Sequence, residues 1–129
     1  MTCYSLLVTT APFDSDAAKR AHDFVVQSHH AGHKVDHIFF YGEGIYHANA
    51  LSSPPTDEYH PREAWQALHE TLGVRLIVCV TAATKRGVIS PQEASEAGIV
   101  MSNLSAPFEQ AGLGEFFTAL HHCDHLVQF

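Results

Sequence analysis

The sequence predicts a three-layer α/β domain, in which a mostly parallel sheet of about five strands is flanked by helices. Three observations support this class. Short apolar runs alternate along the chain with segments of helical periodicity. Residues 74–81 form a nearly continuous apolar, β-branched run, which is typical of a central parallel strand. Residues 90–93, Ser-Pro-Gln-Glu, combine a capping box with proline at the first helical position, which indicates a helix start.

Five runs are expected to form strands because they are short, apolar and bounded by turn residues. They span residues 4–9, 35–40, 74–81, 107–113 and 124–129. The run at 107–113 carries the weakest signal. Between the second and third runs, residues 41–61 hold several glycines and prolines without a clear period. We therefore expect a long irregular loop there, of the kind that often serves function in a compact domain.

Four helices are expected from apolar spacings of three and four residues and from terminal signals. They start after the acidic cluster 14–16, before Trp65, at Ser90 and at Glu115, and end near Gly32, Gly73, Gly98 and His121. Trp65 is expected in the core. The last helix should turn Phe116, Phe117 and Leu120 inward.

The length of 129 residues predicts one domain, 1–129. Hydrophobic residues make up 46% and charged residues 16%, which excludes a disordered chain and a coiled coil. Seven basic against 14 acidic residues give a net charge of −7. Because nucleic-acid binders usually carry a basic stripe, we expect no direct contact with nucleic acid. The one basic pair of note is Lys85 and Arg86.

The cysteines and the chain start predict a cytoplasmic protein. The first ten residues lack the basic start and cleavage site of a signal peptide, and no apolar run approaches a membrane span. The chain has three cysteines, an odd number, and no C-x-x-C pair. Reduced thiols are therefore expected, with no disulfide framework and no membrane partner.

Cys79 is the strongest candidate for chemistry. It lies near the end of run 74–81, at the sheet edge where ligands of parallel α/β proteins bind. Lys85 and Arg86 follow closely, and nearby cations favour the nucleophilic thiolate. Alternatively, Cys79 is a small core residue. Cys3 and Cys123 are expected at the opposite, amino edge, where packing is their expected role and a bridge to Cys79 is out of reach.

Other motifs are weaker. The spacing from Cys79 to Lys85 and Arg86 is similar to the Cys-x₅-Arg loop of phosphatases and rhodaneses, but no glycine intervenes to shape an anion cradle. The 41–46 segment would bring Tyr41, Gly44 and Tyr46 to the walls of a pocket at Cys79, or would be a turn with packed tyrosines. Two histidine clusters, 29–33 and 121–125, are expected to be surface groups, so no metal site is expected.

An ordered set of motifs spans essentially the whole chain. The motifs are FFY-x-x-GIY at 39–46, Ser-Pro at 53–54, IVCV-x-AA at 77–83, KRGV at 85–88, SNL at 102–104, GLG at 112–114 and CDHLVQF at 123–129. In this set the chain closely resembles the DsrE/TusD sulfurtransferase family, and the TusD branch more than the DsrE branch.

The resemblance implies a DsrE-like α/β fold and a persulfide-forming cysteine at Cys79, with no cofactor and no metal. It implies a relay between small sulfur-carrier proteins that ends in 2-thiolation of a tRNA wobble uridine. In the DsrE branch the same chemistry serves cytoplasmic sulfur oxidation. Both branches imply a hetero-hexamer with two paralogous subunits, two copies of each. Lys85 and Arg86 are expected to stabilise the thiolate or contact a partner. A non-catalytic assembly subunit and a cysteine-dependent phosphatase remain alternatives.

Overall fold

The computed structural model describes residues 1–129 and contains one sheet of five parallel strands. The strands are β1 (Cys3–Val8), β2 (Lys34–Phe40), β3 (Arg75–Cys79), β4 (Phe108–Ala111) and β5 (His125–Gln128). Their order in the sheet is β4-β3-β2-β1-β5, and every neighbouring pair is parallel. The predicted α/β class is confirmed, and all five expected strands are present.

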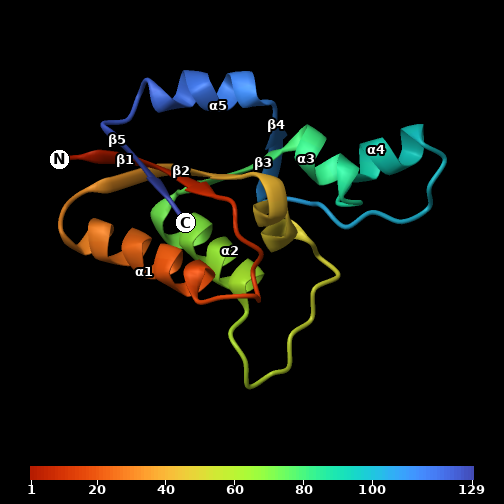
Figure 1. The fold of residues 1–129 in the computed structure, drawn as a ribbon, viewed down its shortest axis with the longest axis horizontal. Helices are drawn as coiled ribbons and strands as arrows, with labels where there is room; N and C mark the ends of the chain where they lie inside the picture. The colour runs from red at the N-terminus through yellow and green to blue at the C-terminus, as the bar shows by residue number, and fades with distance from the viewer.

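Helices cover both faces of this sheet (Figure 1). They are α1 (Ala17–His30), the 3-10 helix η1 (Gly42–Ala48), α2 (Pro61–Leu72), α3 (Val80–Lys85), α4 (Pro91–Glu96) and α5 (Leu113–Leu120). Helices α1 and α2 lie on one face and α5 on the other, while α3 and α4 extend beyond the carboxyl end of β3. None of these helices is both long enough and apolar enough to cross a membrane.

Strand β2 is packed from both faces. Successive strand residues point to opposite sides, so Phe39 and Phe40 face different layers. Phe39 stacks on Phe116 of α5 with ring centroids 4.3 Å apart, and Phe40 meets the edge of Trp65 of α2 at 5.7 Å. All four rings are buried. The core therefore extends through the sheet, with β2 at its centre.

Local signals in the sequence explain several element ends. The Ser90 hydroxyl accepts a hydrogen bond from the Glu93 backbone N–H at 3.2 Å, and the Ser90 N–H donates to Glu93 Oε1 at 3.0 Å. This confirms the predicted capping box of α4. Gly73 follows α2 with φ +71°, a left-handed conformation that favours glycine.

Three expectations were wrong in detail. The run 74–81 does not continue as a strand to Thr81, because the chain turns into α3 directly after Cys79. The segment 41–61 is not wholly irregular, since η1 occupies its first part. Phe117 is 58% exposed, because α5 buries Phe116 and consecutive helix residues point about 100° apart.

A buried histidine joins three parts of the chain. Trp65 Nε1 donates to His47 Nδ1 at 3.0 Å, so the neutral His47 carries its proton on Nε2 and donates it to the Thr10 carbonyl, also at 3.0 Å. His47 is 1% exposed. Burial outweighs the hydrogen bond to Thr10 and lowers the pKa of His47 to about 4, from its usual 6.5. The bonded, neutral imidazole thus holds η1 against α2 and the segment after β1.

We expect His47 to make the fold sensitive to acid. Because its pKa is lower in the folded chain, the unfolded chain binds this proton first as pH falls. The contribution is fully present above pH 6.5 and is lost as pH falls through 4. It amounts to about 3 kcal/mol of unfolding free energy. Urea unfolding of His47→Gln at several pH values should therefore show a shallower acid slope than the wild type. His29→Gln, at an exposed site, is the control; equal slopes for wild type and His47→Gln would contradict the assignment.

Candidate functional site

Cys79 lies where β3 becomes α3. It is the last residue of the strand, and its extended backbone (φ −63°, ψ 115°) makes it the N-cap residue of the helix. Within this helix the small side chains of Ala82 and Ala83 are buried against the core. Cys79 itself is 4% exposed. Its thiol therefore lies at the carboxyl edge of the sheet, next to unpaired backbone N–H groups of the first helical turn.

A hollow of about 430 Å³ opens above Cys79. Its lining comes from the end of β2, from β3 and α3, and from the start of α5. The lining residues are Tyr41, Gly42, Cys79, Thr81, Ala82, Lys85, Arg86 and Leu113. The hollow thus occupies the position at which open parallel sheets bind their ligands.

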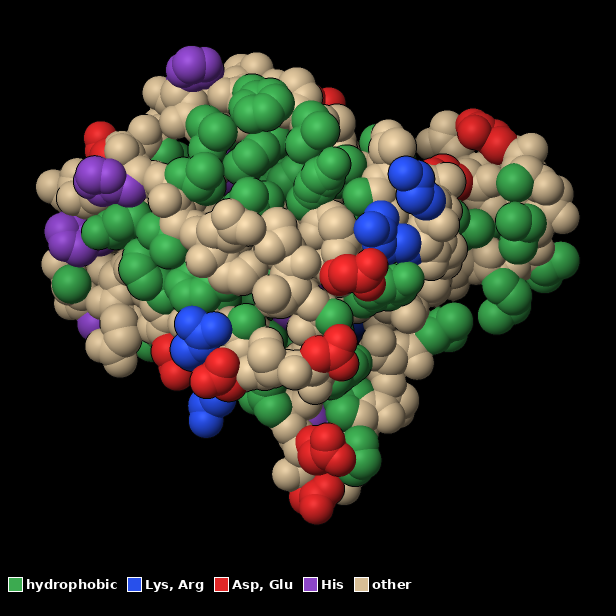
Figure 2. All heavy atoms as spheres, viewed as in Figure 1, with side chains coloured by type: hydrophobic (Ala, Val, Ile, Leu, Met, Phe, Trp, Pro, Cys, Tyr) green, Lys and Arg blue, Asp and Glu red, His purple; other side chains and the backbone are tan.

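The two basic residues of the hollow differ in their surroundings. Arg86 Nη1 donates to the Ala82 carbonyl at 3.1 Å, and Arg86 Nε lies 3.4 Å from Glu43 Oε1. Figure 2 shows basic side chains over α3 with acidic side chains beside them. Lys85 is exposed and takes part in none of the ion pairs of the structure. Lys85 is therefore the basic group of the hollow whose charge is available to an incoming anion.

Of the residues predicted for this site, Tyr41, Lys85 and Arg86 share the hollow with Cys79, whereas Gly44 and Tyr46 do not line it. Gly44 is buried in η1, where an added Cβ would stand 2.0 Å from the Val8 carbonyl oxygen. Its role is to let η1 approach the end of β1. Tyr46 points into a different hollow, which it shares with Phe13 and Asn49 among others.

Leu113 is a site residue that sequence reasoning missed. It begins α5, and it reaches the hollow because β4 pairs with β3, with Ala111 opposite Cys79. No local signal could have indicated this neighbour. Gly42, Thr81 and Ala82 also line the hollow, and they adjoin residues that the sequence did indicate.

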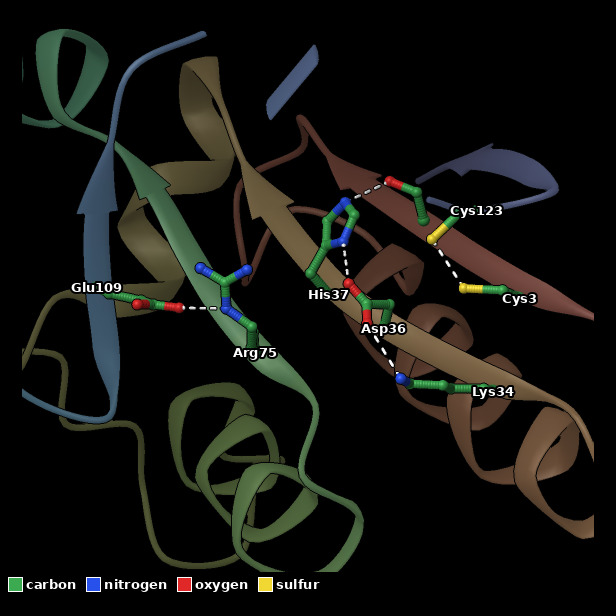
Figure 3. Close-up of polar contacts among 8 residues, drawn as sticks. Cys3, Lys34, Asp36, His37, Arg75, Glu109 and Cys123 are labelled. Carbon is green, nitrogen blue, oxygen red and sulfur yellow. Dashed lines mark hydrogen bonds and ion pairs between the residues drawn. The ribbon is translucent and has the colours of Figure 1, made fainter. Parts of the chain in front are cut away.

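The other two cysteines lie at the amino end of the sheet, as expected from the sequence. They are also in contact, which the sequence analysis did not predict: Cys3 Sγ and Cys123 Sγ are 2.8 Å apart (Figure 3). One group of side chains near them has metal-ligating atoms within 4.8 Å of one another, namely Asp36, His37 and Cys123. The two histidine clusters singled out in the sequence form no such group.

Comparison with known proteins gives consistent results along the whole chain. The DsrE/DsrF-like family model matches residues 4–129. Sulfurtransferase TusD of Proteus mirabilis is 41% identical over 126 residues, which cover 98% of this chain and 97% of the relative. A sulfurtransferase TusD homolog of Vibrio vulnificus is 40% identical over 98% of this chain and 96% of its own length. The crystal structure of the ychN protein from E. coli superposes with a TM-score of 0.76 over all of both chains at 16% identity, which shows the same fold.

We expect Lys85 to speed the reaction of Cys79 with anions. In a chain carrying Cys3→Ser and Cys123→Ser, Cys79 is the remaining thiol. Iodoacetate and iodoacetamide are similar in size, but only iodoacetate is charged. Lys85→Ala should slow alkylation by iodoacetate roughly two- to fivefold more than by iodoacetamide, because one exposed charge contributes at most about 1 kcal/mol.

The matched control for this experiment is Lys19→Ala, since Lys19 is an exposed lysine on α1, away from the hollow. It should leave both alkylation rates unchanged. Equal slowing of the two reagents by Lys85→Ala would show that Lys85 acts through the shape of the hollow and not through its charge.

Proposed function

This chain belongs to the DsrE/DsrF-like family, and we propose that it is a sulfurtransferase that carries sulfane sulfur as a persulfide on Cys79. One observation carries the proposal: a cysteine ends a central strand beneath a hollow that is open to partners and lined by Lys85 and Arg86. The relatives that are about 40% identical over nearly the full chain are themselves sulfurtransferases by name.

The transfer is an exchange at sulfur that needs no outside oxidant. The Cys79 thiolate attacks the outer sulfur of a persulfide on a donor carrier. The donor's S–S bond breaks, its inner sulfur leaves as a thiolate, and the outer sulfur becomes the Cys79 persulfide. The thiolate of an acceptor carrier then attacks the outer sulfur of the Cys79 persulfide, and the Cys79 sulfur leaves as a thiolate. Sulfane sulfur keeps its oxidation state throughout, and the charge is negative on both sides of each step.

The surroundings of Cys79 suit this exchange. Lys85, whose charge is not paired with a carboxylate, lines the same hollow as Cys79 and is placed to attract an anionic donor. The low exposure of Cys79 limits attack on the persulfide by stray thiols. Cys3 and Cys123 lie at the opposite end of the sheet, so no thiol of the same chain stands beside Cys79 to release the sulfur as sulfide.

We propose that the sulfur leaves on a protein carrier in the cytoplasm and ends as the 2-thio group of a tRNA wobble uridine. The similarity to proteins named TusD supports this destination over sulfur oxidation. The net charge of −7 argues against direct contact with tRNA, because phosphate binding requires clustered basic residues. Handover to a carrier therefore precedes any contact between the sulfur and RNA.

We also propose that the chain works in a hetero-hexamer with two paralogous subunits, two copies of each. Large apolar side chains are exposed at two places, over α5 and in the segment after α4 (Figure 2). They include Leu113 and Phe117 on α5, and Ile99, Val100 and Met101 after α4. Contiguous apolar surface of this kind is typical of an interface.

Persulfide loading should depend on Cys79 alone. Incubated with a persulfidated donor, the wild-type chain should gain one sulfur atom in its intact mass, and Cys79→Ser should gain none. The reason is that Cys79 lines the open hollow, whereas the other two thiols are paired with each other at the far end of the sheet. Cys3→Ser and Cys123→Ser are the matched controls and should load like the wild type. Loading that survives in Cys79→Ser would refute the assignment.

The assembly has its own test. A tagged chain purified at native expression should retain two related chains, and native mass spectrometry should give a complex of two copies of each. Phe117→Glu, which places a charge on the exposed face of α5, should weaken retention without changing the fold, because this side chain is already 58% exposed. A monomer at every concentration, with no chain retained, would contradict the hexamer.

A further inference from the structure

We propose that Cys3 and Cys123 form a reversible disulfide that fastens β5 to β1 at the amino end of the sheet. The two thiols come from opposite ends of the sequence, 120 positions apart. Their sulfur atoms are 2.8 Å apart, whereas a disulfide bond is about 2.05 Å long. Closure therefore requires a movement of less than about 1 Å, well within the range of a side-chain adjustment.

The backbone around the pair is already fixed for closure. The Cys3 N–H donates to Asp124 Oδ2, and the Asp124 N–H donates to the Cys3 carbonyl, both at 2.8 Å. The regular pairing of β1 with β5 begins at the next residues, Tyr4 with His125. These contacts hold the two cysteines in register before any covalent bond forms, so closure has little conformational entropy left to lose.

The neighbouring side chains favour a disulfide over a metal site. His37 is fully buried, and both of its ring nitrogens are engaged: Nε2 with Ser5 Oγ at 2.6 Å and Nδ1 with Asp36 Oδ2 at 3.0 Å (Figure 3). Asp36 also pairs with Lys34 at 3.2 Å. A metal ion would have to break these contacts, whereas a disulfide leaves them intact. Burial and the adjacent Cys3 raise the pKa of Cys123 to about 12, so Cys123 is a protonated thiol at neutral pH.

The oxidation balances with a low-molecular-weight disulfide such as glutathione disulfide. Cys3 and Cys123 are both partly exposed, so such a reagent can reach the pair. Cys3 attacks the reagent as its thiolate and releases one glutathione thiolate, which takes up the proton of Cys123. The Cys123 sulfur then attacks the mixed disulfide and releases the second glutathione. Two cysteine thiols lose two electrons and two protons, and the reagent gains both as two glutathione thiols.

The bond would act on one of the two edge strands of the sheet. Strand β5 has four residues, lies at the edge and pairs with β1 alone. A cross-link between positions 120 residues apart strongly restricts the unfolded chain, which raises the stability of the folded state. Cys79 lies at the opposite end of the sheet, so oxidation of this pair leaves it free. The inference therefore stands independently of the function proposed for Cys79.

The test uses the full chain with Cys79→Ser, so that intermolecular disulfides through Cys79 cannot form. The protein is equilibrated in glutathione buffers from fully reduced to fully oxidised. It is then denatured in guanidinium chloride at about pH 8 with excess iodoacetamide, which reacts with thiolates, and weighed intact. We expect two alkyl groups on the reduced form and none on the oxidised form. The oxidised form should melt about 10 °C higher, and dithiothreitol should reverse the shift.

The controls are Cys3→Ser and Cys123→Ser in the same background, which should melt at the same temperature in both buffers. Two reactive thiols in every buffer, or glutathione attached to the cysteines without an internal bond, would overturn the proposal. So would protection of both thiols by zinc ions alone, reversed by a chelator, since that result would make the cluster a metal site.

Discussion

The packing of β2 from both faces is the constraint on which the rest of the structure depends. Phe39 and Phe40 anchor α5 and α2 to opposite sides of one strand, and this fixes where the ends of β2 and β3 lie. Phe40 pairs with Val78, so the residues that follow them, Tyr41 and Cys79, are neighbours at the carboxyl edge of the sheet. Core packing thus places Tyr41 and the Cys79 thiol together in the hollow, without a direct bond between them.

A second set of contacts connects the core to the charged side chains of the hollow. The buried His47 ties η1 to Trp65 and Thr10, and η1 in turn supplies Glu43 to Arg86. One basic side chain of the hollow is therefore held and partly neutralised, and Lys85 is left free. The difference arises from the position of η1 and cannot be read from the two basic residues themselves.

The sequence was informative where local chemistry decides the structure. The apolar run 74–81, most of which forms β3, and the capping box at Ser90 both specify their elements through adjacent residues. It was misleading where tertiary packing overrides propensity: Val80 and Thr81 are β-branched, yet they begin α3. It was silent on contacts that depend on strand order. The approach of Cys3 to Cys123 requires β5 to lie beside β1, and the place of Leu113 requires β4 beside β3. Neither pairing has a signature in nearby residues.

Gly44 limits how this protein can diverge. Its backbone lies so close to Val8 that even alanine would put a carbon 2.0 Å from a carbonyl oxygen. A descendant with any side chain there must move η1 as a unit, and Glu43 moves with it. Compensation would then be required in β1 or at Arg86, far from position 44 in the sequence. Substitution of this one glycine is thereby coupled to changes in two distant segments. A relative with a non-glycine residue here is expected to have lost the pairing of Glu43 with Arg86 beside the hollow.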